Sequence, residues 1–245
     1  MATELVVAII SAGVALVAAG ITIWGQTRST RLAAQLRREE EEEKQRQASL
    51  RLLSRYREPL IHAAFDLQSR IYNILELDIV TRHFNSGTNE TRSYVLNNTT
   101  YLIAQYFGWS EILRQDGLFL DLGEIEKTHR LNTIQDQIGH TWLRDDHDDA
   151  LRIFKGIQRV LGEEVTVQSE MGNVCATYGA FLHLLEQEDK PFLKQLQQQV
   201  AAMLGNPEAS RSRLIQLQHA FIDLIDFLDP RFIRFPKERR SRLDP

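Results

Sequence analysis

The feature that most constrains this chain is an uninterrupted run of apolar and small residues from Leu5 to Trp24, LVVAIISAGVALVAAGITIW. Only Ser11 and Thr22 are polar within it. At about 1.5 Å of rise per residue, a helix of this length matches the roughly 30 Å hydrocarbon core of a bilayer. A cleaved signal peptide would begin with basic residues and have a shorter apolar stretch. We therefore expect residues 1–26 to be a transmembrane anchor whose partner is the lipid bilayer.

Basic residues are concentrated on one side of this run. Before the run the charged side chain is Glu4, and after it come four arginines: Arg28, Arg31, Arg37 and Arg38. The positive-inside rule then predicts a single-pass protein of the inner or plasma membrane, with its N-terminus outside and its C-terminal part in the cytoplasm. Alanines recur within the run at helical spacing, and small residues let two membrane helices approach closely. A homodimer is therefore left open.

A charged segment, residues 27–57, follows the expected anchor. It contains neither glycine nor proline from Arg28 to Arg57, and opposite charges recur four residues apart, as at Arg37 and Glu41. Apolar residues are too sparse for a strong heptad pattern. We expect a solvated spacer helix of about 45 Å, with a weak dimeric coiled coil as the open alternative. Pro59 should end or kink this helix.

The pattern changes at Pro59, and residues 58–245 are expected to form a cytoplasmic, mainly α-helical domain, an irregular bundle. Apolar residues share one face of the first helix: Leu60, Ala64, Leu67, Ile71, Ile74 and Leu75. Further helices are expected over about 91–115, 124–143 and 150–163. Two or three more should follow, separated at Gly205-Asn206-Pro207, and the last should end at Asp229-Pro230. Alternation at Val165 and Val167, with SEMGN as a turn, predicts a small β-hairpin.

Three segments of this domain suggest a family: REPLIHAAFDLQSRIYNIL, AQYFGWSEILR and LIDFLDPRFIRFP. Together they make the chain after Leu50 resemble uncharacterised bacterial proteins with one N-terminal membrane span and a cytoplasmic helical domain. The resemblance implies this architecture and no activity.

Polar residues form a stripe beside the apolar face of the first domain helix. Asp66, Arg70 and Asn73 are spaced so that they lie along one side, and Asp66 can pair with Arg70. Such a stripe can be a structural network, because buried polar groups need partners. It can also be a small-ligand pocket shared with the neighbouring helix. The candidate ligand-binding residues are Asp66, Arg70, Asn73, Gln105, Glu111 and Arg114.

No motif identifies a catalytic residue, a metal or a cofactor. The sequence lacks a glycine-rich phosphate loop and the GxSxG, HExxH and CxxC patterns. A single Glu-x-x-His pair, Glu126 and His129, is interpreted as a solvated helix face. Asp136, His140 and His147 together could bind a divalent cation, but the loop lacks the ligand spacing and central glycine of an EF-hand. The aspartates of RDDHDD are interpreted as a loop and helix cap. The lone Cys175 is expected to be a buried small residue, which suits a reducing compartment.

The end of the chain, PRFIRFPKERRSR, combines basic residues with two phenylalanines, Phe232 and Phe235. It can lie on anionic lipid, or its phenylalanines can pack on the core with the charges in solvent. The net charge of −4 argues against a nucleic-acid partner.

The functional prediction is a membrane-anchored cytoplasmic interaction or signalling module with a protein partner. The alternative is a membrane-associated enzyme or small-ligand sensor that uses a polar pocket around Asp66, Arg70 and Glu111. The sequence leaves enzymatic activity uncertain and leans against it.

Overall fold

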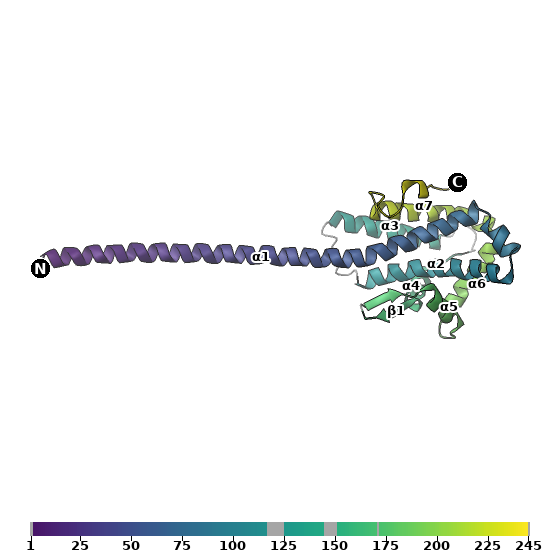
Figure 1. Ribbon diagram of the computed structural model, residues 1–245, viewed down its shortest axis with the longest axis horizontal. Helices are drawn as coiled ribbons and strands as arrows, with labels where there is room; N and C mark the ends of the chain where they lie inside the picture. Colours follow the sequence, from purple (N-terminus) through teal and green to yellow (C-terminus); the bar gives the residue numbers. More distant parts are fainter. Residues whose placement is uncertain (1, 117–124, 145–150, 171, 245) are drawn as a thin grey trace. The chain divides into compact units, whose positions relative to one another are not determined.

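The chain divides into two compact units, Met1–Leu50 and Arg51–Pro245. The computed structural model describes residues 2–116, 125–144, 151–170 and 172–244; for residues 2–12, 14–23, 25, 27, 45–46, 48–54, 116 and 125 it describes the backbone alone. We call the second unit the helical domain. Figure 1 traces the chain in sequence colours. The expected boundaries at 26 and 57 stay predictions.

Helix α1 (Ala2–Leu75) contains both the apolar run and the charged segment. From Arg28 to Lys44 all side chains are exposed, as a solvated spacer requires. In the part of the chain whose side chains are described, no helix is long and apolar enough to cross a bilayer. Within the expected span, Leu5 to Trp24, the structure describes more than the backbone only at Gly13 and Trp24.

Of the two outcomes predicted at Pro59, an end of the helix is not observed, and a kink stays a prediction. Helix α1 continues to Leu75 with Pro59 inside it. A proline removes one helical hydrogen bond and crowds the preceding turn. On both sides of Pro59, however, the helix buries apolar side chains, Tyr56 and Leu60, in the core of the domain. This burial stabilises the helix enough to offset the lost bond.

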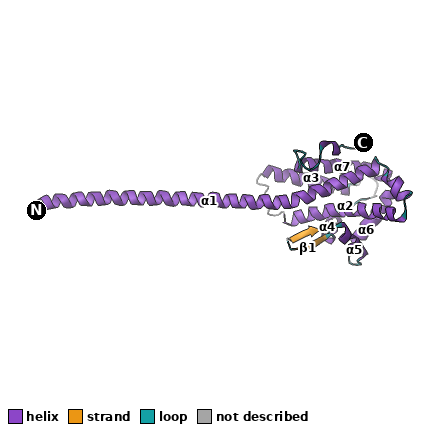
Figure 2. Cartoon of the chain, viewed as in Figure 1, coloured by secondary structure: helices purple, strands orange, loops and turns teal. Residues whose placement is uncertain are grey.

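The helical domain is mainly α-helical, with one small antiparallel sheet in its described part, which confirms the predicted fold class at this level (Figure 2). In the described part of the domain, the helices after α1 are α2 (Asn89–Asp116), α3 (Ile125–Leu143), α4 (Lys155–Glu164), α5 (Tyr178–Glu186), α6 (Pro191–Gly205) and α7 (Arg211–Leu228). Shorter turns are the π-helical η1 (Val80–Asn85) and the 3-10 turns η3 (Pro207–Ser210) and η4 (Lys237–Arg239). Strands β1 (Thr166–Ser169) and β2 (Gly172–Cys175) form the predicted hairpin, with Thr166 opposite Cys175.

Helix α4 begins later than predicted. Leu151 has a positive φ of 62°, and the Ile153 amide donates to the Trp142 carbonyl at 2.9 Å, so residues 151–154 are not helical. Leu151 and Ile153 are both buried. Their packing in the core therefore replaces the helical turn that was expected from Ala150. The predicted aspartate cap, together with the rest of residues 145–150, lies outside the described residues.

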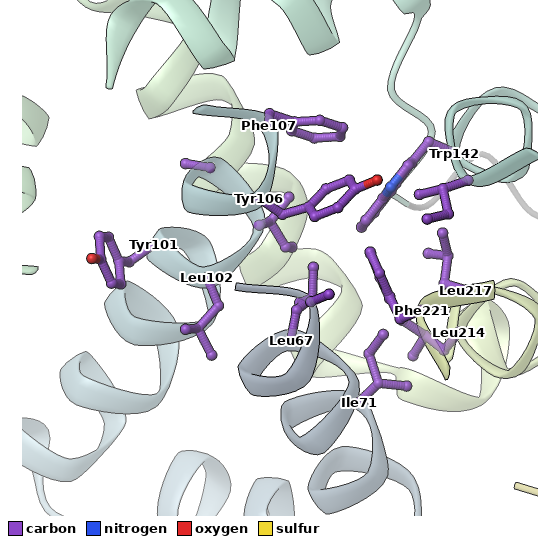
Figure 3. Packing of buried hydrophobic residues seen from close by; sticks show 14 of the residues in the cluster. Leu67, Ile71, Tyr101, Leu102, Tyr106, Phe107, Trp142, Leu214, Leu217 and Phe221 are labelled. Carbon is purple, nitrogen blue, oxygen red and sulfur yellow. The ribbon is translucent and has the colours of Figure 1, made fainter. Parts of the chain in front are cut away.

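The core lies where α1, α2, α3 and α7 meet. Helix α2 packs against α4 and α6, and α3 packs against α7. Figure 3 shows Tyr106 of α2 close to Phe221 of α7 and to Trp142 of α3. The Tyr106 and Phe221 rings meet edge to face with centroids 4.8 Å apart. The predicted apolar face of the first domain helix is also confirmed, because five of its members are buried: Leu60, Ala64, Leu67, Ile71 and Ile74.

Candidate functional site

A cavity of about 720 Å³ lies in the helical domain between α1, α2 and the C-terminal segment. Three of the predicted residues line it from α1, namely Asp66, Arg70 and Asn73. Their spacing along a helix places them on one side, as the sequence predicted. Helix α2 contributes Asn98 and Leu102, and the C-terminal segment contributes Glu238, Arg239 and Ser241. We call this space the Arg70 cavity.

Arg70 is the most unusual residue of this cavity, because it is buried without an acidic partner among the residues that the structure describes. It is 8% exposed. One guanidinium nitrogen, Nη2, donates to the side-chain oxygen of Asn98, and the Tyr94 ring lies 6.0 Å from the guanidinium carbon. The other terminal nitrogen, Nη1, is buried and has no hydrogen-bond partner among the described residues. Leaving a buried donor unsatisfied costs about 1–3 kcal/mol, and more for a charged group.

The ion pair that the sequence allows between Asp66 and Arg70 is not among the contacts of the described side chains. Arg70 instead reaches across to Asn98 on α2. Burial lowers the pKa of Arg70, while Tyr94 and Tyr178 partly oppose that shift. Partial burial of its carboxyl group raises the pKa of Asp66, and the nearby His62 works in the opposite direction. The two charges therefore face different surroundings within one cavity.

Glu111 and Arg114 line a second cavity, of about 320 Å³, together with Arg159 of α4 and Asn132 and Gln135 of α3. Glu111 is 4% exposed and accepts a hydrogen bond from the Arg114 Nε at 2.8 Å. Burial alone would raise the pKa of Glu111, but hydrogen bonds from Arg114 and Gln115 and the charges of Arg114 and Arg159 lower it below its ordinary value. Glu111 thus already has a partner on its own helix.

Gln105 is not among the residues lining either cavity. Its Nε2 donates to the Tyr101 hydroxyl at 3.0 Å, and that hydroxyl donates to the Ala176 carbonyl at 3.1 Å. This chain of bonds links α2 to the end of the hairpin. The six predicted residues therefore occupy three places, and the structure brings together Asp66, Arg70 and Asn73 only.

The C-terminal segment was not predicted to form a wall of the cavity. After α7, Asp229 accepts backbone hydrogen bonds from Ile233, Arg234 and Phe235, at 2.9, 3.0 and 3.2 Å. The buried Arg240 returns to pair with the Asp229 carboxylate at 2.5 Å. Nearer the cavity, the Gln68 amide donates to the Arg239 carbonyl at 3.4 Å. The aspartate in DPRF and the arginine eleven residues later carry no motif that signals this pairing.

The basic end of the chain was expected either to lie on anionic lipid or to pack its phenylalanines on the core. Phe235 packs on the core. Its ring stacks on Phe65 of α1 with centroids 3.7 Å apart and an interplanar angle of 7°. Phe232 and the neighbouring Ile233 are instead 43% and 62% exposed. Four basic side chains around them are exposed, Arg231, Arg234, Lys237 and Arg239.

Cys175 is a free, buried thiol. Burial raises its pKa to about 12. A thiol must be ionised to act as a nucleophile, so this environment suits a packing role, as predicted. For metals, the described residues contain no group of three or more His, Cys, Asp or Glu side chains close enough to hold an ion. Asp136 pairs with Lys155 at 3.4 Å, and the predicted aspartate loop lies outside the described residues.

No protein-family model, no curated protein and no solved structure matches this chain. The resemblance to uncharacterised bacterial membrane-anchored proteins therefore stays a prediction.

Proposed function

We propose that the chain is a single-pass membrane-anchored module whose helical domain works in the cytoplasm by binding a protein partner. The apolar run from Leu5 to Trp24 is the observation that carries this proposal. It has the length of a bilayer span and is followed by arginines at positions 28, 31, 37 and 38. The fully exposed, charged helical segment from Arg28 to Lys44 suits a spacer between anchor and domain.

The surface around Phe232 and Ile233 is the contact we assign to the partner. Both side chains are exposed although they are apolar, and Phe232 holds a positive φ of 55°. The buried pair of Asp229 and Arg240 sets the conformation of this loop. Exposed apolar side chains surrounded by exposed arginine and lysine favour a partner with an apolar patch and acidic neighbours.

Two experiments test the anchor and the topology with the full chain. The protein should remain in the membrane fraction after extraction with alkaline carbonate, whereas a variant lacking residues 2–26 should be released. A protease added to intact cells should leave the helical domain undigested, and the same protease added to inside-out vesicles should cleave it. Extraction of the full chain, or digestion of the domain from outside the cell, would contradict the proposal.

The partner is tested by a photo-crosslinking amino acid placed at Ile233, with Val167 on the hairpin as the control position. Val167 is also exposed, at 36%, but it lies on strand β1 and not in the C-terminal segment. We expect a discrete protein adduct at Ile233 that is absent at Val167. An adduct with lipid, or equal adducts at both positions, would contradict a protein-binding role for this loop.

A further inference from the structure

The Arg70 cavity is lined by a buried positive charge that has no acidic partner among the described residues. In soluble proteins a buried arginine is nearly always paired with an acid. Here the neutral Asn98 accepts from Nη2, Tyr94 lies beside the guanidinium, and Nη1 has no partner in the described part of the chain. The fold thus keeps an arginine desolvated without compensating its charge. Because Arg70 lines the cavity, an anion bound there would compensate this charge.

The other lining residues restrict which anion fits. Phe65 and Leu102 provide apolar surface, and Asn73 provides an amide group. Asp66 and Glu238 also line the cavity, and they would repel a polyphosphate or another multiply charged ligand. A planar guanidinium matches the two oxygens of one carboxylate, which makes arginine a preferred carboxylate binder. The volume of about 720 Å³ lies within the range typical of small-molecule sites.

We propose that the Arg70 cavity binds a small organic monocarboxylate, with the ligand's carboxylate paired to the Arg70 guanidinium and its body against Phe65 and Leu102. This proposal goes beyond the anchored interaction module, because it needs neither the membrane nor the protein partner.

The docked C-terminal segment completes the site. Gln68 lines the cavity and holds the segment through the Arg239 carbonyl. Gln218 of α7 donates to Gln68 at 3.3 Å and to the Ser241 carbonyl at 2.8 Å. One wall of the cavity is therefore present only when this segment is packed on α1 and α7. Ligand binding should in turn stabilise the docked segment.

The test measures the thermal midpoint of the full chain in detergent with four carboxylates and their uncharged counterparts. The probes are butyrate, benzoate, lactate and N-acetylglycine, each beside its primary amide, with inorganic phosphate as a different anion. At least one carboxylate should raise the midpoint more than its amide and more than phosphate do. The variant Arg70→Gln should weaken binding of that carboxylate at least about tenfold, because a charge-assisted pair is lost. Arg82→Gln removes an exposed arginine outside the cavity and should leave the affinity unchanged.

A second variant keeps the test informative if Arg70→Gln folds poorly. Asn98→Asp places a carboxylate where Asn98 already contacts Arg70. It should raise the midpoint of the ligand-free protein and abolish the response to the carboxylate, because the arginine is then paired internally. The proposal is overturned if no carboxylate exceeds its amide, if phosphate stabilises more than every carboxylate, or if Arg70→Gln or Asn98→Asp binds as tightly as the wild type. Membrane attachment plays no part in these readouts, so their failure would leave the proposed anchor standing.

Discussion

Replacement of Asp229 by asparagine removes the negative charge that faces the buried Arg240. In the structure, the Asp229 carboxylate accepts three backbone hydrogen bonds and pairs with a guanidinium whose side chain is 2% exposed. Removing one partner of a buried ion pair costs about 3–5 kcal/mol, because the other charge stays desolvated. Arg240 keeps a second, half-exposed partner in Asp226 at 2.8 Å, and asparagine keeps one acceptor oxygen. The expected loss for Asp229→Asn is therefore at the lower end, about 3 kcal/mol.

Urea unfolding of the full chain in detergent, followed by tryptophan fluorescence, measures this loss. Trp142 is fully buried in the core and reports on the helical domain. With an m-value of about 2 kcal/mol per M, a loss of about 3 kcal/mol lowers the urea midpoint by about 1.5 M. The matched control is Asp223→Asn, which breaks the Asp223–Arg242 pair. That pair is 2.6 Å long but nearly half exposed on both sides, so its loss should cost less than about 1 kcal/mol.

The pH dependence gives an independent check on the same pair. Burial alone would raise the pKa of Asp229, but three backbone N–H groups and the charge of Arg240 lower it below its ordinary value of 3.8. A lowered folded-state pKa contributes stability that is present above 3.8 and is lost as the pH falls through the folded-state value. The difference in stability between wild type and Asp229→Asn should therefore shrink below that pH. Equal midpoints for Asp229→Asn and Asp223→Asn at neutral pH would refute the assignment of Asp229 and Arg240 as the pair that holds the C-terminal segment.

Three further predictions concern packing. Gly162→Ala should destabilise the domain by about 1–3 kcal/mol, since the new Cβ would lie 2.6 Å from the Glu111 Cβ. Gly156→Ala, on the same helix, has open space around the new Cβ and should stabilise the domain by about 0.5–1 kcal/mol. Urea midpoints that move equally in the two variants would contradict the close packing of α2 on α4. Phe235→Ala should lower the free energy of unfolding by about 3 kcal/mol, because it removes a buried stacked ring. In the same assay, Phe232→Ala should lower it by less than about 1 kcal/mol, because that ring is exposed. The reverse order would show that the C-terminal segment is not docked as described. Cys175 should resist iodoacetamide at about pH 8 in the folded protein and react once urea unfolds it, as followed by mass spectrometry; rapid labelling without urea would contradict its burial.

Local patterns account for most of the helical domain. The apolar positions from Leu60 to Ile74 recur at helical spacing, and they bury the face that this spacing predicts. The hairpin follows from the alternation at Val165 and Val167 and the turn signal that comes after it. Where a helix boundary differs from the expected one, contacts distant in sequence decided the outcome. Helix α1 passes Pro59 because its flanking residues pack in the core, and α4 starts late because Leu151 and Ile153 are buried there instead.

The candidate site shows the same division. Helical spacing alone placed Asp66, Arg70 and Asn73 on one side of a helix. Spacing does not tell which neighbour a polar side chain contacts. It therefore predicts neither the contact between Arg70 and Asn98 nor the position of Glu111 in a different cavity. Glu111 faces the second cavity with Arg114, while Gln105 bonds to Tyr101. These outcomes depend on how α2 is rotated against α1, α3 and α4, which is set by the packing of the whole core.

By itself, the sequence of this protein determined a helical chain with an apolar N-terminal run, a charged helical segment and the buried faces of its domain helices. Those properties depend on residues close together in the chain, since helix propensity and hydrophobic periodicity are local. Tertiary structure alone decided that the C-terminal segment packs on Phe65 and Gln68, and that Arg70 meets Asn98 and no acidic side chain in the described part of the chain. The partners of a buried charge come from distant parts of the chain, and the fold determines which of them come within hydrogen-bonding distance.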